Sequence, residues 1–225
     1  AMRPLAPFLT LVLCGALLGS ASPQLRDEDG HDLWLRYQLV ADAARLREYR
    51  AAAIYLVVQG NSPTLTAARD ELAAGLRGLL GAQIPSARRV TRDGAVVAGT
   101  PANSPLIASL PIAEELRRVG DEGFVLRATL VGGRQVIVIA ANRDVGVLYG
   151  AFHLLRLLQT HAPLRGLAVA SAPRIQLRLL DHWDNLDRTV ERGYAGRSLW
   201  DWPALQDSLD GRYRDYARAN ASLGI

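Results

Sequence analysis

Cysteine and lysine are the residue types that this 225-residue sequence most clearly lacks. It contains one cysteine, Cys14, and no lysine, so that arginine supplies all 26 of its Lys and Arg side chains. Cys14 lies in an N-terminal apolar stretch that we expect to be removed, which leaves no thiol in the mature chain. We therefore expect no disulfide bond and no thiol chemistry within the mature part of this sequence.

No long block of like charge occurs either. The formal net charge is +4, and acidic residues are interspersed among the arginines. Nucleic-acid-binding segments usually gather basic residues in one run or on one face. The sequence therefore predicts no nucleic acid partner.

Several motifs of metal, phosphate and hydrolase chemistry are absent as well. The chain has no HExxH, CxxC or Gly-x-Ser-x-Gly motif. Gly132 and Gly133 lie between two strand-like arms, so turn geometry explains them better than a phosphate-binding loop does. His31, His153 and His161 are isolated. We predict no metal site.

Residues 1–22 have the pattern of a secretory signal peptide. Arg3 supplies a positive start, "LAPFLTLVLCGALLG" is an apolar run, and "SAS" offers small residues for cleavage near Ser20 to Ser22. The run is shorter than the roughly 20 residues that a membrane span needs. We therefore predict export to the periplasm or out of the cell, with no membrane attachment after cleavage.

Residues 25–165 mix strand and helix patterns. Apolar runs and alternation predict strands over 31–40, 52–60 and 94–100, a loop over 100–107, and a hairpin over 122–142. Helical periodicity predicts helices over 42–52, 62–81 and 143–160. This mixture is typical of a compact α/β sandwich domain.

A second, incomplete domain is predicted over residues 174–225. A linker over 161–173 precedes a strand over 174–183, a long loop, and a helix over 208–225. Strand, loop and helix form the opening unit of a parallel α/β fold, and one such unit cannot bury its own faces.

The long loop carries the strongest functional signal. Its stretch "LLDHWDNLDRTVERGYAGRSLWDW", residues 179–202, contains three tryptophans among acidic and basic side chains. An indole ring can stack on a pyranose while polar neighbours bind its hydroxyl groups. The alternative is structural: Trp183, Trp200 and Trp202 close the end of a core, and the charged residues form salt bridges within the loop.

Three segments carry a resemblance to a known family. The stretches "EDGHDLWLRYQ" (28–38), "NRDVGVLYGAFHLLRLLQT" (142–160) and above all residues 179–202, followed by "YARANASLGI", resemble the α-glucuronidases of glycoside hydrolase family 67. The resemblance implies an α/β fold class: an α+β sandwich accessory domain followed by the first βα unit of a truncated TIM (β/α)8 barrel. It implies no cofactor, and homodimers of the full-length protein.

The resemblance also implies an activity. Such enzymes remove (4-O-methyl)glucuronic acid from xylooligosaccharides by hydrolysing an α-1,2 link with inversion, so glucuronoxylan-derived oligosaccharides are the expected partners. Inversion needs an acid and a base carboxyl group roughly 6.5–9.5 Å apart. The family carries these groups on later barrel strands, so we expect no catalytic residue in this chain and no activity of the chain alone.

Only the motif at the end of the first barrel strand can be carried over to this sequence. Trp183 matches a tryptophan that lines the family's pocket against the uronic acid. His182, Asn185 and Asp187 match the same motif and are expected to shape the substrate-binding site. Arg197, Trp200 and Asp201 are expected to support the loop.

Two other classes of protein stay open. One is a non-catalytic module that binds carbohydrate or a protein partner. The other is the accessory domain of a different glycosidase, such as a hexosaminidase, because helices like that over 143–160 occur there too.

Overall fold

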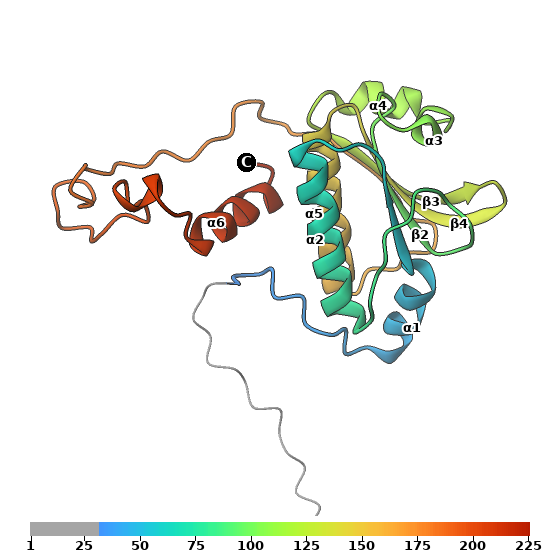
Figure 1. Cartoon of the computed structure of the whole chain (residues 1–225). Coiled ribbons are helices and arrows are strands. Elements are labelled where there is room, and N and C mark those ends of the chain that lie inside the picture. The colour runs from blue at the N-terminus through green and yellow to red at the C-terminus, as the bar shows by residue number, and fades with distance from the viewer. Residues whose placement is uncertain (1–31) are drawn as a thin grey trace, which may run out of the picture. The chain divides into compact units, whose positions relative to one another are not determined.

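Five strands form one mixed sheet in the computed structural model, which describes residues 32–225 (Figure 1). The strands are β1 (Tyr55–Val58), β2 (Ala95–Gly99), β3 (Phe124–Val131), β4 (Arg134–Ala141) and β5 (Ala168–Ser171). Their order across the sheet is β1-β2-β4-β3-β5. β2 is parallel to both β1 and β4, whereas β3 is antiparallel to both β4 and β5.

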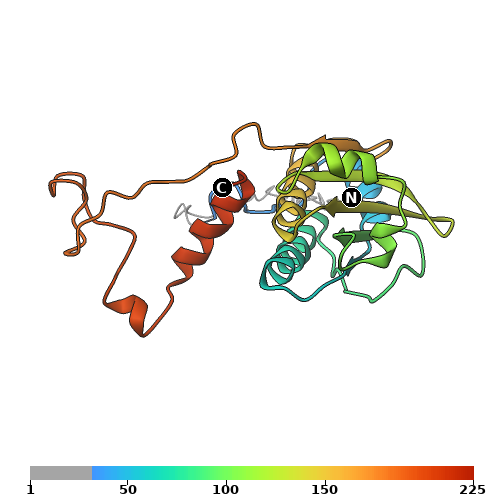
Figure 2. The ribbon, with the colours of Figure 1, turned by 90° about the horizontal axis from the view of Figure 1, so that it is seen from above.

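Helices cover both faces of this sheet: α1 (Ala43–Ala52), α2 (Pro63–Leu80) and α5 (Asp144–Gln159) lie on one, and α3 (Pro105–Ala108) and α4 (Ala113–Val119) on the other. A 3-10 turn, η1 (Ala204–Gln206), and α6 (Gly211–Ser222) follow later in the chain, and α6 packs against α5. α2 and α5 run side by side in both ribbon views (Figures 1 and 2). They share one core with α1, and α3 and α4 contribute to a second core. The predicted α/β class is confirmed.

Alternation along the strands separates the two cores. Leu56 and Val96 belong to the core under α2 and α5, whereas Val57 and Val97 belong to the core under α3 and α4. Successive side chains of a strand point to opposite faces, which explains this division. All four side chains are fully buried, as a sheet covered on both sides requires.

Local signals set the long helix α2 and the hairpin as predicted. The Ser62 hydroxyl accepts the backbone N–H of Leu65, and Gly81 ends α2 in the left-handed conformation with φ 61°. The turn between β3 and β4 uses Gly132 and Gly133 at φ 55° and 76°, the sign that a two-residue type I′ turn requires. Asp42 caps α1 through the N–H groups of its first turn.

The strand predicted over 31–40 is wrong for its described residues. Leu35 and Tyr37 are buried and Arg36 is exposed, so the alternation is real. However, Leu33 and Tyr37 have positive φ, and the segment crosses the end of α2, where the Val40 N–H donates to the Leu79 carbonyl. Packing on a helix has produced the same two-residue pattern as a strand.

Three further helices and strands were not predicted, namely α3, α4 and β5. Part of the expected loop over 100–107 is the start of α3, which Ser104 caps by accepting the N–H of Ile107. The expected linker over 161–173 contains β5, which extends the sheet beyond residues 25–165 by pairing with β3. β5 has only four residues and is half exposed, so it leaves little hydrophobic signal.

Residues 174–183 do not form the predicted strand. No described strand lies beside them, and Ile175, Leu177 and Leu179 are exposed. A strand needs a hydrogen-bonded neighbour, so the apolar pattern of residues 174–183 is not sufficient to form one. The helix expected after the long loop is present as α6, which Asp210 caps.

The signal peptide expected over residues 1–22 lies outside the described residues. Within residues 32–225, no helix is both long enough and apolar enough to span a membrane.

Candidate functional site

The loop between residues 181 and 202 has a folded backbone of its own. The N–H of Asn185 donates to the carbonyl of Thr189 at 2.8 Å, and the N–H of Glu191 donates to the carbonyl of Trp183 at 2.9 Å. The N–H of Ser198 closes a second turn by donating to the carbonyl of Arg188 at 2.8 Å. These bonds fold the middle of the loop onto itself.

Trp200 is the centre of an aromatic cluster that joins the loop to α6. Its ring stacks on that of Tyr213, with centroids 5.0 Å apart and planes inclined by 15°, and Trp202 lies 6.2 Å away from it. Tyr216 and His182 meet Trp200 edge-on at 5.8 and 5.6 Å. Such offset and edge contacts are the favoured aromatic geometries. Two of the three loop tryptophans therefore have a structural role.

A buried polar pair fixes the two sides of the loop. The Ser198 hydroxyl donates to Oδ2 of Asp184 at 2.5 Å and accepts the N–H of Trp200 at 2.9 Å. The Asp184 side chain is only 8% exposed, and its Oδ2 lies 4.0 Å from Nδ1 of His182. His182 and Asp184 thus lie close together.

His182 and Asn185 are both engaged within the protein. Nε2 of His182 lies 2.6 Å from the Tyr216 hydroxyl on α6. The amide nitrogen of Asn185 donates to the Thr189 hydroxyl at 2.9 Å and to the Glu191 carbonyl at 2.6 Å. Both side chains therefore orient the loop.

Asp187 shapes the turn beside them. Its Oδ1 accepts both the hydroxyl and the N–H of Thr189, at 2.7 and 2.9 Å. These two hydrogen bonds hold the pKa of the Asp187 carboxyl below its usual range, because they favour the charged form.

Trp183 is different from the other predicted site residues, because its side chain is 71% exposed. Its carbonyl accepts the N–H of Glu191, so the backbone that carries the ring is fixed. A large aromatic side chain on a fixed backbone and open to solvent is suited to stacking against a ligand. His182 and Asp187 are exposed as well, but their side chains, like that of Asn185, are bonded to neighbours within the protein.

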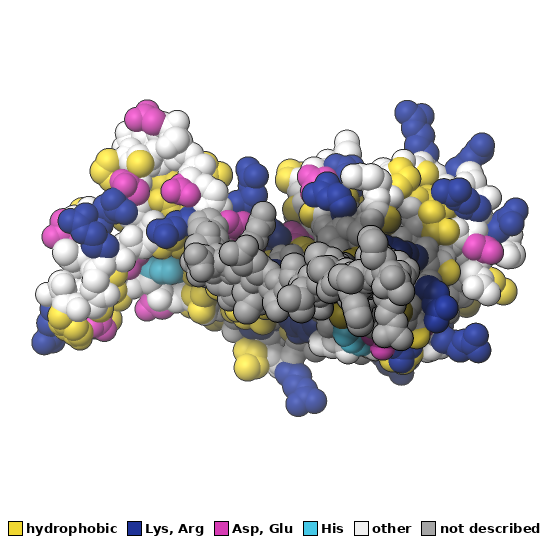
Figure 3. Space-filling model, turned by 90° about the horizontal axis from the view of Figure 1, so that it is seen from below, with side chains coloured by type: hydrophobic (Ala, Val, Ile, Leu, Met, Phe, Trp, Pro, Cys, Tyr) yellow, Lys and Arg dark blue, Asp and Glu magenta, His cyan; other side chains and the backbone are white. Residues whose placement is uncertain are grey.

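The loop's remaining charged groups have supporting contacts. Asp201 accepts Nη1 of Arg188 at 2.7 Å, and its N–H donates to the Tyr213 hydroxyl at 2.8 Å. Trp200 and Asp201 thus make the supporting contacts expected of them, whereas Arg197 is exposed. Acidic and basic side chains are mixed over the left part of the face in Figure 3, with no broad area of one sign.

The sequence places Tyr213 and Tyr216 on one side of the predicted helix, because they are three residues apart, but it gives them no part in the site. Ser198 was not singled out at all. No local pattern marks Ser198, because its partner Asp184 is 14 residues away.

Two hollows of the described surface lie apart from this loop. One of about 820 Å³ is lined by α1, the β3–β4 arms and residues 163–166. A shallower one of about 640 Å³ lies along residues 33–41 and includes Trp34. In the described part of the chain, no three His, Cys, Asp or Glu residues form a group that could hold a metal ion. Neither hollow is lined by a residue of the loop.

Comparisons with known proteins cover nearly all the described residues. Residues 33–154 match the model of the glycosyl hydrolase family 67 N-terminus, and residues 157–225 match that of the family 67 middle domain. The chain is similar to alpha-glucuronidase A of Emericella nidulans, with 32% identity over 233 residues that cover 96% of this chain and 25% of the relative. Probable alpha-glucuronidase A of Aspergillus oryzae is 31% identical over 227 residues, which cover 97% of this chain and 25% of the relative.

The chain thus spans about a quarter of the length of the curated relatives it matches. A solved structure, that of a family GH115 4-O-methyl-α-glucuronidase with specificity for decorated arabinogalactans, aligns with 47% of this chain and 13% of its own. Its TM-score is 0.39 at 24% sequence identity.

Proposed function

The chain belongs to glycosyl hydrolase family 67, and we propose that it is the N-terminal part of an α-glucuronidase that degrades xylan. In this proposal the substrate is a xylooligosaccharide that carries (4-O-methyl)glucuronic acid through an α-1,2 link. Hydrolysis proceeds with inversion, and the chain contributes one wall of the sugar pocket. The names of the relatives support the glucuronidase activity, and the substrate, linkage and stereochemistry are our proposal.

Trp183 is the observation that carries this proposal. Its side chain is 71% exposed on a loop whose other two tryptophans pack into an aromatic cluster. Leaving a large apolar ring exposed has no benefit for folding, because its burial is what would stabilise the protein. Stacking against the apolar face of a sugar gives the ring a function.

Three of the acidic residues of the loop are assigned to structure rather than to acid–base chemistry. Asp184 is bonded to Ser198, Asp187 to Thr189, and Asp201 to Arg188. An inverting hydrolase needs two carboxyl groups roughly 6.5–9.5 Å apart on opposite sides of the scissile bond, with room for water. We propose that other parts of the family polypeptide supply this pair, so that the 225-residue chain alone is inactive.

Proton NMR of the hydrolysis reaction tests the proposal. The gene product that contains this chain is incubated with xylotriose bearing α-1,2-linked 4-O-methylglucuronic acid on its non-reducing end. Inversion predicts that the β-anomer of the free uronic acid appears first and then equilibrates with the α-anomer. Initial release of the α-anomer would overturn inversion, and no release of uronic acid would overturn the activity.

A matched pair of variants tests the wall itself. Trp183→Ala should lower kcat/KM by about 10- to 100-fold, as expected when a central aromatic contact is removed. Leu186→Ala is the control, because Leu186 is 88% exposed in the same loop. Equal activities of the two variants would remove Trp183 from the binding site.

A further inference from the structure

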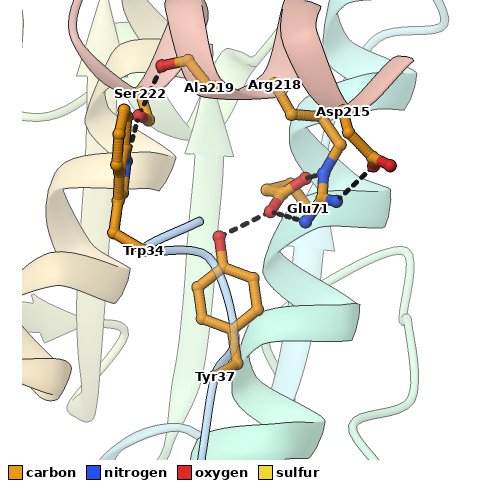
Figure 4. A network of polar contacts seen from close by, with 7 residues as sticks. All are labelled: Trp34, Tyr37, Glu71, Asp215, Arg218, Ala219 and Ser222. Atoms are coloured by element: carbon orange, nitrogen blue, oxygen red, sulfur yellow. Dashed lines mark hydrogen bonds and ion pairs between the residues drawn. The ribbon is translucent and has the colours of Figure 1, made fainter. Parts of the chain in front are cut away.

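A buried carboxylate on α2 anchors α6 (Figure 4). Glu71 is 7% exposed, and Arg218 of α6 binds it through two parallel contacts: Nε to Oε2 at 2.7 Å and Nη2 to Oε1 at 2.9 Å. Nη1 of Arg218 also contacts Oδ1 of Asp215 at 3.0 Å. A guanidinium that binds a carboxylate in this way is fixed in orientation as well as in position.

Tyr37 completes the anchor from a third segment of the chain. Its hydroxyl donates to Oε1 of Glu71 at 2.5 Å, and its side chain points at the same carboxylate as Arg218 does (Figure 4). Burial and the adjacent Glu71 charge raise the pKa of the Tyr37 phenol far above its usual range. The phenol therefore remains a hydrogen-bond donor to Glu71 throughout the physiological pH range.

The C-terminal residue of α6, one turn beyond Arg218, is held separately. The Trp34 indole N–H donates to the Ser222 hydroxyl at 2.8 Å, and Nη2 of Arg156 donates to the Ser222 carbonyl at 2.7 Å. Two attachment points along one helix fix both its position along its axis and its rotation.

α6 also contacts the candidate sugar-binding loop, residues 181–202. Tyr216 is two residues before Arg218 and lies 2.6 Å from His182, the neighbour of Trp183. Tyr213 stacks on Trp200 and accepts the N–H of Asp201. α6 is therefore in contact with the α2–α5 layer through Arg218 and with the loop through its two tyrosines.

We propose that Tyr37, Glu71 and Arg218 are positioning residues for the sugar-binding loop, which they orient through α6. Naming the loop as sugar-binding rests on the function proposed above. The α2–α5 layer then contributes to the site by fixing the position of the sugar-binding loop, without any contact with the sugar.

Helix geometry explains why an ion pair suits this role better than apolar packing. A shift of α6 by one residue moves it by about 1.5 Å and turns its side chains by about 100°, which would take Tyr216 away from His182. Buried ion pairs often add little stability, and the best-attested use of buried polar groups is to fix register. A bidentate Arg218–Glu71 pair can form in one register of α6, whereas an apolar contact can form in several.

Hydrogen exchange of the 225-residue chain tests the proposal without any sugar. In Glu71→Gln, the amides of Ser198 and Asp201 should exchange at least about 10-fold faster than in the parent, because loss of the pair allows α6 to move. Arg218→Lys keeps the charge but loses the fork, and should have the same effect. Slow exchange of the β2 and β4 amides is the internal control that shows that the sheet is still folded.

The matched control is Glu115→Gln, which breaks the part-buried Arg127–Glu115 pair of 2.7 Å between β3 and α4, away from α6. It should leave the loop amides unchanged. Unchanged loop amides in Arg218→Lys would overturn the proposal, as would equal acceleration in the Glu115→Gln control. If Glu71→Gln loses the protected sheet as well, Arg218→Lys decides the matter.

This result is separable from the proposed function. If the parent enzyme has no glucuronidase activity but loop exchange is accelerated in both variants, the proposed function fails and the positioning role holds. If the parent is active but loop exchange is unaffected in the variants, the proposed function holds and the positioning role fails. In the active enzyme, Arg218→Lys should raise KM for the oligosaccharide more than it lowers kcat, because the variant displaces a binding wall.

Discussion

The hydroxyl of Tyr216 and Nε2 of His182 lie 2.6 Å apart, although 34 residues separate them in the sequence. This contact links α6 to the residue directly before the exposed Trp183. Which partner donates depends on the imidazole tautomer. In either case, the direction of the Trp183 backbone is tied to a helix rather than to the loop alone.

Tyr216→Phe should loosen this link while keeping the aromatic packing. Because the His182 side chain is 35% exposed, water can replace the lost partner, and we expect the free energy of unfolding to fall by only about 0.5 kcal/mol. Urea denaturation measures the loss, and NMR of the His182 imidazole reports the broken contact. Tyr194→Phe is the control, since Tyr194 is 76% exposed; an equal change in the imidazole signals of both variants would contradict the prediction.

Ser198→Ala should have a larger effect, because Ser198 is only 6% exposed. The substitution leaves the buried Asp184 carboxylate without its donor and the Trp200 N–H without its acceptor. A buried group left unpaired costs about 1–3 kcal/mol, so the loop should open roughly ten-fold more often or more.

Limited trypsin digestion measures this opening, since Arg192 and Arg197 lie in the loop. Cleavage after them should accelerate in Ser198→Ala. It should not accelerate in Ser109→Ala, where the exposed hydroxyl bonds only to the nearby Leu106 carbonyl. Equal cleavage rates in the two variants would show that the Ser198 contacts do not hold the loop.

Features governed by local chemistry were predictable from the sequence. Ser62 and Gly81 mark the ends of α2, and Gly132-Gly133 marks a hairpin turn, because caps and turns are decided within a few residues. The segment 31–40 was misread, because burial against a helix gave Leu35 and Tyr37 the alternation of a strand.

The sequence predicts which residues form the candidate site, but its local patterns do not predict which of them are exposed and which support the loop. The family resemblance assigns Trp183 to the pocket and Trp200 to support of the loop, yet no local pattern in the sequence distinguishes the two. The difference lies in Tyr213 and Tyr216, which cover Trp200 and leave Trp183 exposed. The Glu71–Arg218 pair joins residues 147 apart, and such a pairing follows from the fold rather than from any motif.

Gly78→Ala should destabilise the protein, because a methyl group there meets backbone. A Cβ on Gly78 would lie 2.3 Å from the Tyr37 carbonyl oxygen, so the segment that carries Tyr37 must move. We expect a loss of about 1–3 kcal/mol from overpacking, which outweighs the gain of about 1 kcal/mol in helix propensity.

Thermal unfolding checks this with Gly211→Ala as the control. At Gly211, the first residue of α6, a Cβ meets nothing within 4 Å, and the change should be neutral or stabilise by about 0.4–1 kcal/mol. A Gly78→Ala melting temperature at or above the parent's would mean that the close approach to Tyr37 relaxes without cost.

His153 should make the stability of the protein depend on pH between neutral and mildly acidic conditions. It lies on α5 with its ring 5.2 Å from Phe124. Burial, together with the Arg156 charge, lowers its pKa below the ordinary 6.5. The folded state therefore favours neutral imidazole, while the unfolded chain binds a proton as the pH falls through 6.5.

The sign of the effect follows from this difference in proton binding. The stability contributed by neutral His153 is fully present above pH 6.5, falls as the pH drops towards the folded pKa, and is completely lost below it. Urea denaturation at a series of pH values should show this decline in the parent and a weaker one in His153→Gln. The exposed His161, whose φ is +58°, provides the control as His161→Asn, because asparagine tolerates that backbone conformation. If the decline persists unchanged in His153→Gln but disappears in His161→Asn, then His161 rather than His153 causes the pH dependence.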